Sequence, residues 1–287
     1  MKNLKEYIVE GIFDTDENTI DKNIKDQIKS FLKENFKGAS SCKISRKPNI
    51  DGKYEVSSSK NIKVKNEKIT SLTNGLFIWT NVDEDFICSN CYSLTSLEGA
   101  PKKVRENFSC YGCKSLKSLK GAPEEVGIFN CSNCYLLTSL DGAPKEVRGS
   151  FMCERCDSLT SLKGLPEKIG GSFDCWDCKS LTSLKGAPKE VGRDFGCCYC
   201  YSLKSLEGAP EKVGARFTCC WCHSLTSLEG APKEVGENFN CSGCDSLKSL
   251  KGAPKEVSGS FNCNDCGMKF TENDVKNVSN VKRNIYI

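Results

Sequence analysis

The sequence predicts an α/β-type solenoid dominated by short parallel β-strands, with a small α+β cap at its N-terminal end and a short C-terminal cap. Three observations predict this fold. Cysteine pairs recur with a step of 22 residues, one phrase recurs around every pair, and the flanking segments keep the pattern without the cysteines. A period in the twenties is typical of solenoids, in which each coil buries its apolar face only against its neighbours.

The cysteines define the period. Eighteen of the 21 cysteines fall into nine C-x-x-C pairs: Cys88/Cys91, Cys110/Cys113, Cys131/Cys134, Cys153/Cys156, Cys175/Cys178, Cys197/Cys200, Cys219/Cys222, Cys241/Cys244 and Cys263/Cys266. One step, from Cys110 to Cys131, is 21 residues instead of 22. Only Cys42, Cys198 and Cys220 lie outside this register. A large and odd number of cysteines implies free thiols, and we therefore expect a reducing compartment.

Each repeat follows the phrase F-x-C-x-x-C-x-S-L-x-S-L-x-G-A-P-x-x-V-x-x-x. The alternation of apolar and polar residues over 108–110 predicts a short strand with one buried face. Leu116 and Leu119 return two more side chains to the interior, and residues 121–123 (Gly-Ala-Pro) turn the chain. Val126 then points inward from a short helical turn or an extended segment. One coil buries too few apolar groups to be stable alone, whereas the array is long enough.

A cysteine-free coil is expected at each end of the array. Residues 62–72 keep the apolar spacing of a repeat, and Val281 and Ile285 keep the spacing of its valine and phenylalanine. Between them, Thr271 predicts the N-cap of a short helix, with Asp274 in its first turn. The expected division of the chain is an N-terminal segment at 1–10, the α+β cap at 11–60, the solenoid at 61–267 and the C-terminal cap at 268–287.

The segment before the array predicts the α+β cap. Apolar residues recur on one face of a helix, at Ile20, Ile24, Ile28, Phe31 and Leu32. Gly38 is a typical stop for such a helix. Asp51 and Gly52 then lie between two β-prone runs, 42–45 and 54–57, and this arrangement predicts a hairpin.

The repeat phrase resembles that of the leucine-rich repeat family. The family's strand phrase L-x-x-L-x-L-x-x-N/C-x-L maps onto Val126, Phe129, Cys131, Cys134 and Leu137. The L-x-S-L-x-G-A-P stretch is similar to the short bacterial subtype, in which a proline-containing extended return replaces the helix. The resemblance covers residues 62–287 and departs from the family where phenylalanine and cysteine replace leucine and asparagine. It implies a fold but names no ligand.

Two hypotheses account for the cysteine pairs. In the first, the first cysteine packs like a small hydrophobe, and the second takes the asparagine position and caps backbone carbonyls in a ladder. In the second, the pairs hold structural zinc, because C-x-x-C pairs separated by 17 or 18 residues match paired-knuckle zinc sites. Disulfides along the ladder are not expected, because the chain has no visible secretion signal and bridges within a pair would distort the coil.

Three observations favour packed thiols over zinc, so that we expect no metal or other cofactor. Nine pairs is an odd number, and two pairs per zinc leave one pair over. The repeats are uniform and lack the two-repeat alternation that shared zinc sites would impose. Neighbouring strands lie about 4.8 Å apart, whereas thiolates on one zinc, each about 2.3 Å from the metal, lie about 3.8 Å from each other.

The outward positions around the first cysteine differ between repeats, and in this fold they line the concave face. Aromatic and arginine side chains gather there in an otherwise small and polar face, at Tyr111, Arg155, Trp176, Tyr199, Arg216 and Trp221. Such residues are the usual hot spots of protein interfaces. The sequence therefore predicts a non-enzymatic scaffold that binds another protein through this face. The alternative is that these are tolerated surface residues of a diverging array.

Composition argues against other classes of protein. No apolar run approaches the roughly 18 residues that a membrane-spanning helix needs. The net charge is only +4 and lies in no long basic block, which disfavours nucleic-acid binding. An enzyme is the third hypothesis, in which the single histidine, His223, would activate Cys220 or Cys222. We expect a monomer.

The first ten residues resemble the leader of internal head proteins of large tailed phages. The similarity consists of a Met-Lys start, a Glu-aromatic-Ile core and the Ile8-Val9-Glu10 end, and it implies cleavage between Glu10 and Gly11. The alternative is a frayed or amphipathic terminus. The segment lacks the apolar core of a signal peptide. We therefore expect the cytoplasm of a bacterial or host cell, or, for a packaged phage protein, the virion interior.

Overall fold

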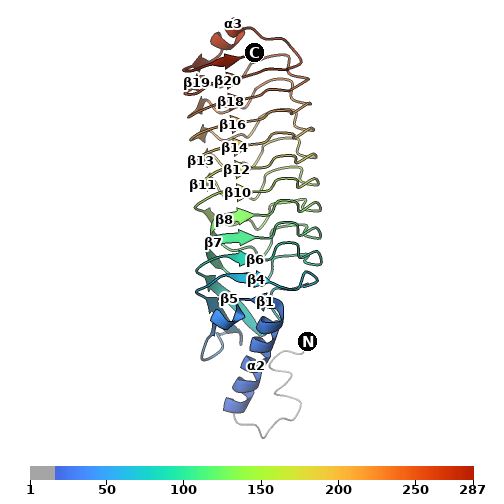
Figure 1. Cartoon of the computed structure of the whole chain (residues 1–287), viewed down its shortest axis with the longest axis vertical. Helices are drawn as coiled ribbons and strands as arrows, with labels where there is room; N and C mark the ends of the chain where they lie inside the picture. Colours follow the sequence, from blue (N-terminus) through green and yellow to red (C-terminus); the bar gives the residue numbers. More distant parts are fainter. Residues whose placement is uncertain (1–16) are drawn as a thin grey trace.

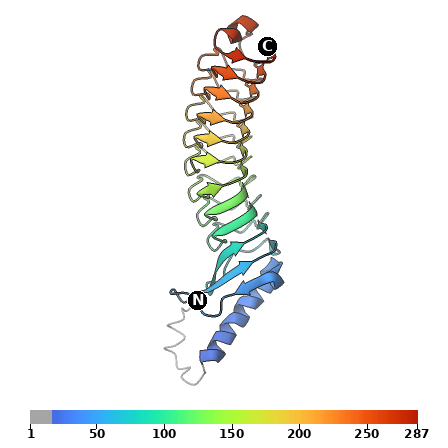
Figure 2. The same ribbon diagram turned by 90° about the vertical axis from the view of Figure 1, so that its left-hand side faces the viewer.

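The structure is a computed structural model and describes residues 17–287 of the chain. These residues form a parallel β-solenoid of about eleven turns, closed by a short helical cap at the N-terminal end and a short cap at the C-terminal end. The repeats stack into a long column, which is nearly straight in Figure 1 and gently bent in Figure 2. The expected fold class is therefore confirmed.

The first of two parallel ladders carries the phenylalanines and is called the Phe ladder. It consists of β4 (Ile62–Val64), β6 (Phe86–Ile87), the second halves of β7 (Lys103–Ser109) and β8 (Glu125–Asn130), β10 (Phe151–Met152), β12 (Phe173–Asp174), β14 (Phe195–Gly196), β16 (Phe217–Thr218), β18 (Phe239–Asn240), β20 (Phe261–Asn262) and β22 (Ile285–Tyr286). Each phenylalanine pairs with the phenylalanine of the next repeat. Ile62 and Ile285 occupy this position in the two cysteine-free coils, as expected.

The second ladder carries the valines and is called the Val ladder. It consists of β3 (Tyr54–Ser58), β5 (Phe77–Val82), the first halves of β7 and β8, β9 (Glu146–Val147), β11 (Lys168–Ile169), β13 (Glu190–Val191), β15 (Lys212–Val213), β17 (Glu234–Val235), β19 (Glu256–Val257) and β21 (Asn280–Val281). Of the two conformations expected around Val126, the extended one is correct. The segment is a strand whose backbone pairs with both neighbouring repeats.

The N-terminal cap covers the starting edge of both ladders. α2 (Glu17–Asn35) is followed by β1 (Phe36–Lys37), η1 (Ala39–Ser41) and β2 (Cys42–Ile44). β1 pairs antiparallel with β4, and β2 pairs antiparallel with β3, so the expected hairpin is present. Ile28 and Leu32 are buried. The expected stop at Gly38 is wrong, because α2 ends at Asn35 and β1 follows it; Gly38, with φ +92°, instead precedes η1. α2 crosses the end of the column in Figure 2.

The C-terminal cap begins with a capping box, as the sequence predicts. Thr271 is the N-cap of α3 (Glu272–Lys276), and its hydroxyl accepts a hydrogen bond from the backbone N–H of Asp274. The Asp274 carboxylate accepts a hydrogen bond from the backbone N–H of Thr271 in return. Neither α2 nor α3 combines the length and apolar composition that a helix needs to cross a membrane.

A continuous stack of phenylalanine rings fills the interior. Nine rings, from Phe86 to Phe261, lie one above another with centroids 5.0–5.9 Å apart. The paired leucines and the C-x-x-C cysteines pack around this stack, and almost all of them are inaccessible to solvent. The core is therefore one column of like side chains and extends through the whole array.

The glycine of the Gly-Ala-Pro turn brings successive coils into close backbone contact. Gly186, for example, has φ +89°, and a Cβ at this position would lie 2.5 Å from the backbone nitrogen of Lys163. Gly75, in the cysteine-free first coil, has nearly the same φ of +86° but no atom within 4 Å of its Cβ position. The turn therefore requires glycine for two reasons, the positive φ and the close approach of the preceding coil. At Gly75 only the positive φ applies.

Replacing Gly186 should destabilise the array more than replacing Gly75. Gly75→Ala imposes only the left-handed backbone, which costs about 1–2 kcal/mol. Gly186→Ala imposes the same strain and also a clash with the preceding coil. We expect the midpoint of thermal unfolding, followed by circular dichroism, to fall several degrees further for Gly186→Ala. Equal shifts for the two variants would show that the coils do not approach as closely as described.

Candidate functional site

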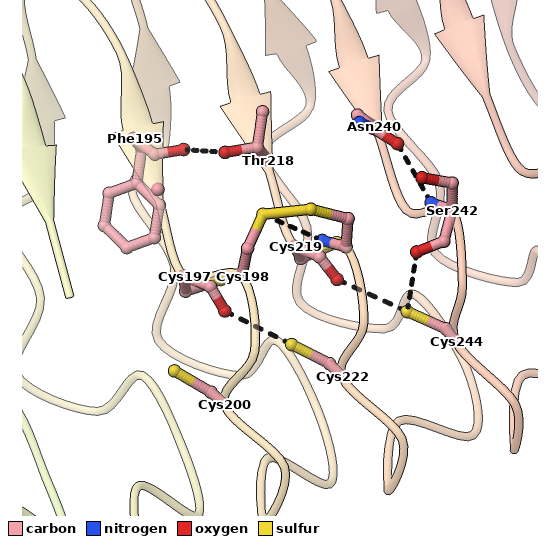
Figure 3. The surroundings of a disulfide bond; sticks show 12 residues. Phe195, Cys197, Cys198, Cys200, Thr218, Cys219, Cys222, Asn240, Ser242 and Cys244 are labelled. Atoms are coloured by element: carbon pink, nitrogen blue, oxygen red, sulfur yellow. Dashed lines mark hydrogen bonds between the residues drawn. A yellow bond between two sulfur atoms is a disulfide. The ribbon is translucent and has the colours of Figure 1, made fainter. Parts of the chain in front are cut away.

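In eight of the nine pairs, all but Cys88/Cys91, the second cysteine caps the backbone of the preceding repeat. Its Sγ donates a hydrogen bond to the carbonyl oxygen of the first cysteine one repeat earlier, at 3.1–3.4 Å. Figure 3 shows two of these bonds, from Cys222 to Cys197 and from Cys244 to Cys219. The expected ladder of thiols and carbonyls is confirmed.

Burial keeps the first cysteine of these pairs protonated. Desolvation, reinforced by neighbouring thiols, raises the pKa of Cys110, Cys153 and Cys175 well above its ordinary value. The thiolate is the form that binds metals, so a protonated thiol is a poor ligand. Within residues 17–287, no three His, Cys, Asp or Glu side chains are grouped so that they could hold a metal ion.

The second residue between the two cysteines adopts a left-handed conformation in every repeat. Seven of these nine residues are not glycine, namely Asn90, Asn133, Arg155, Asp177, Tyr199, Trp221 and Asp265, with φ between 52° and 60°. The other two are Gly112 and Gly243. Glycine, asparagine and aspartate tolerate this conformation, whereas other residues pay about 1–2 kcal/mol. Arg155, Tyr199 and Trp221 are thus maintained against a local backbone preference.

Two of these strained residues belong to an exposed aromatic cluster, defined by Tyr199, Tyr201, Trp221 and His223. The rings of Tyr199 and Trp221 are parallel within 1°, with centroids 6.3 Å apart, and those of Tyr201 and His223 are parallel within 5° at 5.2 Å. The two stacks meet edge to face. The Nδ1 atom of His223 lies 2.9 Å from an oxygen of Asp245. Aromatic pairs in these geometries attract one another beyond their area of burial.

Each exposed tryptophan lies against a glycine of the next repeat. A Cβ at Gly196 would overlap the indole Nε1 of Trp176, and a Cβ at Gly243 would lie 2.6 Å from the indole Cδ2 of Trp221. Gly196 is the one glycine in its column of the Phe ladder. These two glycines therefore make the space in which the indoles lie, and they hold both rings in defined positions although 40–42 % of each tryptophan is exposed.

The two arginines of the predicted site are both engaged within the chain. The guanidinium of Arg216 donates to both carboxylate oxygens of Asp194, at 3.2 and 3.1 Å. Burial opposes ionisation of Asp194, but the hydrogen bonds from Arg216 outweigh it and hold the pKa of this carboxyl below its ordinary value. Arg155 forms a longer ion pair of 3.6 Å with Asp177. The arginines thus shape the surface next to the tryptophans.

Carboxylates lie beside Trp176. Burial and, to a lesser extent, the nearby carboxylates of Glu154 and Asp194 together raise the pKa of Asp174 to about 6, against the opposing charge of Arg216. Burial also raises the pKa of Glu154. Because a raised carboxyl pKa favours the protonated form, the contribution of Asp174 to the stability of the fold is fully present below its ordinary pKa of 3.8 and is lost as the pH rises through about 6.

The structure brings together five of the six residues predicted for the site. Arg155, Trp176, Tyr199, Arg216 and Trp221 lie in four consecutive repeats on the side of the Phe ladder that faces away from the core. Tyr111 is exposed in the same column as Trp176, but three repeats earlier. At about 4.8 Å per repeat, this places it roughly 14 Å along the column, outside the cluster.

The column of residues that directly follows the second cysteine was not predicted to belong to the binding surface. It contributes Tyr201 and His223 to the aromatic cluster, and near the N-terminal end it places the Lys114 ammonium 5.2 Å from the ring centre of Tyr92 and 5.9 Å from that of Tyr135. The signal was available, because residues one repeat apart in this column have complementary chemistry. Such pairs are visible when the repeats are aligned and the residues at one position are compared between adjacent repeats.

The expectation of free thiols fails for one pair of cysteines, which lies outside the register of the ladder. Cys198 and Cys220 form a disulfide with their Cα atoms 4.6 Å apart, while the other 19 cysteines are free. They occupy the same column in adjacent repeats, so the solenoid register itself brings them within bonding distance. The pairing also removes Cys220 as a partner for His223. Cys222 is buried and donates to Cys197.

No protein-family model, curated protein or solved structure matches this chain. The solenoid is therefore established by the chain's own repeats and strand pairing. The predicted processing site at Glu10 and Gly11 lies outside the residues that the structure describes.

If Tyr199 and Trp221 are retained for function, replacing them should not harm the fold. Asparagine occupies the same position at Asn90 and Asn133, so Tyr199→Asn with Trp221→Asn relieves about 1–2 kcal/mol of strain per residue. The lost ring contacts are worth about 0.5–1.5 kcal/mol. We expect a chemical denaturation midpoint equal to or above that of the original protein.

The reverse substitution provides the control. Asn133→Tyr places an aromatic side chain on a left-handed backbone without the neighbouring cluster, and it should lower the stability by about 1–2 kcal/mol. If Tyr199→Asn with Trp221→Asn lowers the free energy of unfolding by more than about 1–2 kcal/mol, the aromatic cluster is a structural element.

Proposed function

We propose that this chain is a non-enzymatic repeat scaffold that binds another protein through the outward side of the Phe ladder, around Trp176, Tyr199 and Trp221. The observation that carries the proposal is the left-handed backbone of Tyr199 and Trp221, at a position where six of the nine repeats use asparagine, aspartate or glycine. Strain that persists at an exposed surface is typical of residues kept for recognition.

The geometry of the tryptophans supports this proposal. Their indoles lie against Gly196 and Gly243 and are already ordered before any partner arrives. A side chain that is ordered in the free protein loses little conformational entropy on binding, so more of its contact energy contributes to affinity. Partly exposed tryptophan and tyrosine are also the residues that most often dominate protein interfaces.

The shape of the surface favours a protein over a small molecule. Small ligands bind in concave pockets that enclose most of their surface. A cleft in the described residues lies at the N-terminal cap, between α2 and β2, where Leu32, Cys42 and Ile44 line it together with basic side chains. The aromatic cluster instead lies on the open side of the Phe ladder, where a second protein surface can cover it.

The remaining features of the proposal follow from the thiols and from the sequence. Free thiols at 19 of the 21 cysteines support a reducing compartment such as the cytoplasm. The repeat period and the parallel strands are compatible with a leucine-rich-repeat-like array, which supports a scaffold without naming a partner. A phage origin rests on the N-terminal segment alone, and intact-mass measurement of virion-derived protein tests it, since a mass starting at Met1 would exclude cleavage after Glu10.

Partner capture with matched variants tests the proposal. The site variant is Trp176→Ser with Trp221→Ser, and the control is Glu190→Ser with Lys212→Ser on the exposed side of the Val ladder. Loss of two hot-spot tryptophans should cost at least about 2 kcal/mol, or roughly thirtyfold in affinity. We expect the original protein and the control to retain the same partner from native-host lysate and the site variant to release it. Equal capture by all three folded proteins would refute the proposal.

The zinc hypothesis is the second candidate function, because the spacing of the C-x-x-C pairs matches zinc knuckles. Protonated, carbonyl-bound thiols favour metal-free protein, so we expect metal analysis of protein purified without chelator to find far less than one zinc per chain. About four zinc ions per chain, two pairs to each ion, would instead establish zinc as the element that holds the repeats together.

A further inference from the structure

The disulfide between Cys198 and Cys220 is isolated among free thiols. Other repeats carry serine, tyrosine, glutamate, tryptophan or asparagine at this position, so only here do two cysteines lie in adjacent repeats of one outward column. Figure 3 shows the bond crossing between the repeats, above the inward thiols of Cys197, Cys200, Cys219 and Cys222. Those inward cysteines are free and buried.

The bond lies at the base of the aromatic cluster. Tyr199 follows Cys198 directly, and Trp221 follows Cys220 directly, so the crosslink joins the two turns that carry the parallel rings. Both turns have left-handed backbones, with φ of 60° at Tyr199 and 57° at Trp221. A covalent link next to two strained turns restricts their opening, because both turns must then move together.

The two sulfur atoms differ in their surroundings. Cys198 is only 1 % exposed, and its Sγ accepts a hydrogen bond from the backbone N–H of Cys220 at 3.2 Å. Cys220 is partly exposed. Cys220 is therefore the more accessible residue of the pair for an incoming thiolate, and its N–H can stabilise the negative charge that develops on the departing Sγ of Cys198.

We propose that Cys198 and Cys220 form a thiol–disulfide exchange site that takes a dithiol reductant and controls the order of the aromatic cluster. In the oxidised form the crosslink holds Tyr199 and Trp221 in the parallel arrangement. In the reduced form the two turns open independently. The effect on partner binding rests on the proposed function, whereas the exchange chemistry does not.

The reaction balances with a dithiol as the two-electron donor. One thiolate of the dithiol attacks the Sγ of Cys220, forms a mixed disulfide and releases the Cys198 thiolate, which takes up a proton. The second thiol of the reductant then loses its proton and attacks the reductant's first sulfur, which is bonded to Cys220 in the mixed disulfide. This step releases the Cys220 thiolate, which is protonated in turn. The products are two protein thiols and one cyclic disulfide.

Alkylation at lysis tests whether the bond exists in the cell. Cells are lysed in iodoacetamide with denaturant and without reductant, and the modified cysteines are mapped by mass spectrometry. We expect 19 alkylated cysteines, with Cys198 and Cys220 recovered as one crosslinked peptide pair unless they are reduced first. Alkylation of both cysteines in every growth condition would overturn the proposal.

Hydrogen–deuterium exchange of the folded protein tests the coupling. We expect dithiothreitol to accelerate amide exchange in the turns at 197–200 and 219–222 about tenfold or more, because a disulfide restricts local opening. The turn at 175–178 is the internal control and should not change. A bond that dithiothreitol reduces only after denaturation, or turns that exchange equally fast in both forms, would overturn the proposal.

A variant separates loss of the bond from loss of the fold. Serine occurs naturally at this position in Ser89, Ser132 and Ser242, so Cys198→Ser with Cys220→Ser should fold. It should show the fast exchange of the reduced protein and no response to dithiothreitol. If this redox behaviour holds but substitution of Trp176 and Trp221 leaves partner capture unchanged, the proposed function fails and the exchange site stands.

Discussion

The whole structure depends on one constraint: each residue lies directly beside its counterpart in the next repeat. Two parallel ladders enforce this register, Phe173 opposite Phe195 and Val191 opposite Val213. Identical side chains are consequently stacked at a fixed spacing. The interior is therefore stable only if each buried side chain packs favourably against the same residue type in the next repeat. Phenylalanine rings stack, and a thiol donates to the carbonyl of the preceding repeat. The core is thus assembled from contacts of a chain with its own repeated pattern.

The same register makes the surface a set of columns in which neighbours are paired by chemistry. Lys179 lies 3.2 Å from Asp157 one repeat earlier, Trp221 lies parallel to Tyr199, and Cys220 is bonded to Cys198. Each of these interactions involves one outward position of the 22-residue repeat and leaves the buried positions unchanged. A repeat array can therefore diversify its surface while keeping its fold, and the outward columns are where binding and redox chemistry can be added.

Periodicity is why the fold could be predicted so closely from sequence. The 22-residue step located the Phe strand, the thiol ladder and both cysteine-free coils, because these features depend on local patterns repeated many times. The choice between a helical turn and an extended segment at Val126 could not be made from the sequence, because the strand there pairs only with neighbouring repeats. The Cys198–Cys220 bond, and the contribution of Tyr201 and His223, depend on which outward positions become neighbours, and that requires reading along columns rather than along the chain.

The central claim, that the fixed register places a protonated thiol beside a carbonyl of the preceding repeat, is tested most directly by infrared spectroscopy of the S–H stretch. The account predicts a strong S–H band, moved to lower frequency than that of a free thiol. The band should persist at alkaline pH for donors such as Cys113, because the contact with Cys88 and burial raise the pKa of this thiol. A Cys178→Ser variant should weaken this band. Absence of an S–H band in the native protein would mean that the sulfurs are thiolates, metal ligands or disulfides, and would contradict the account.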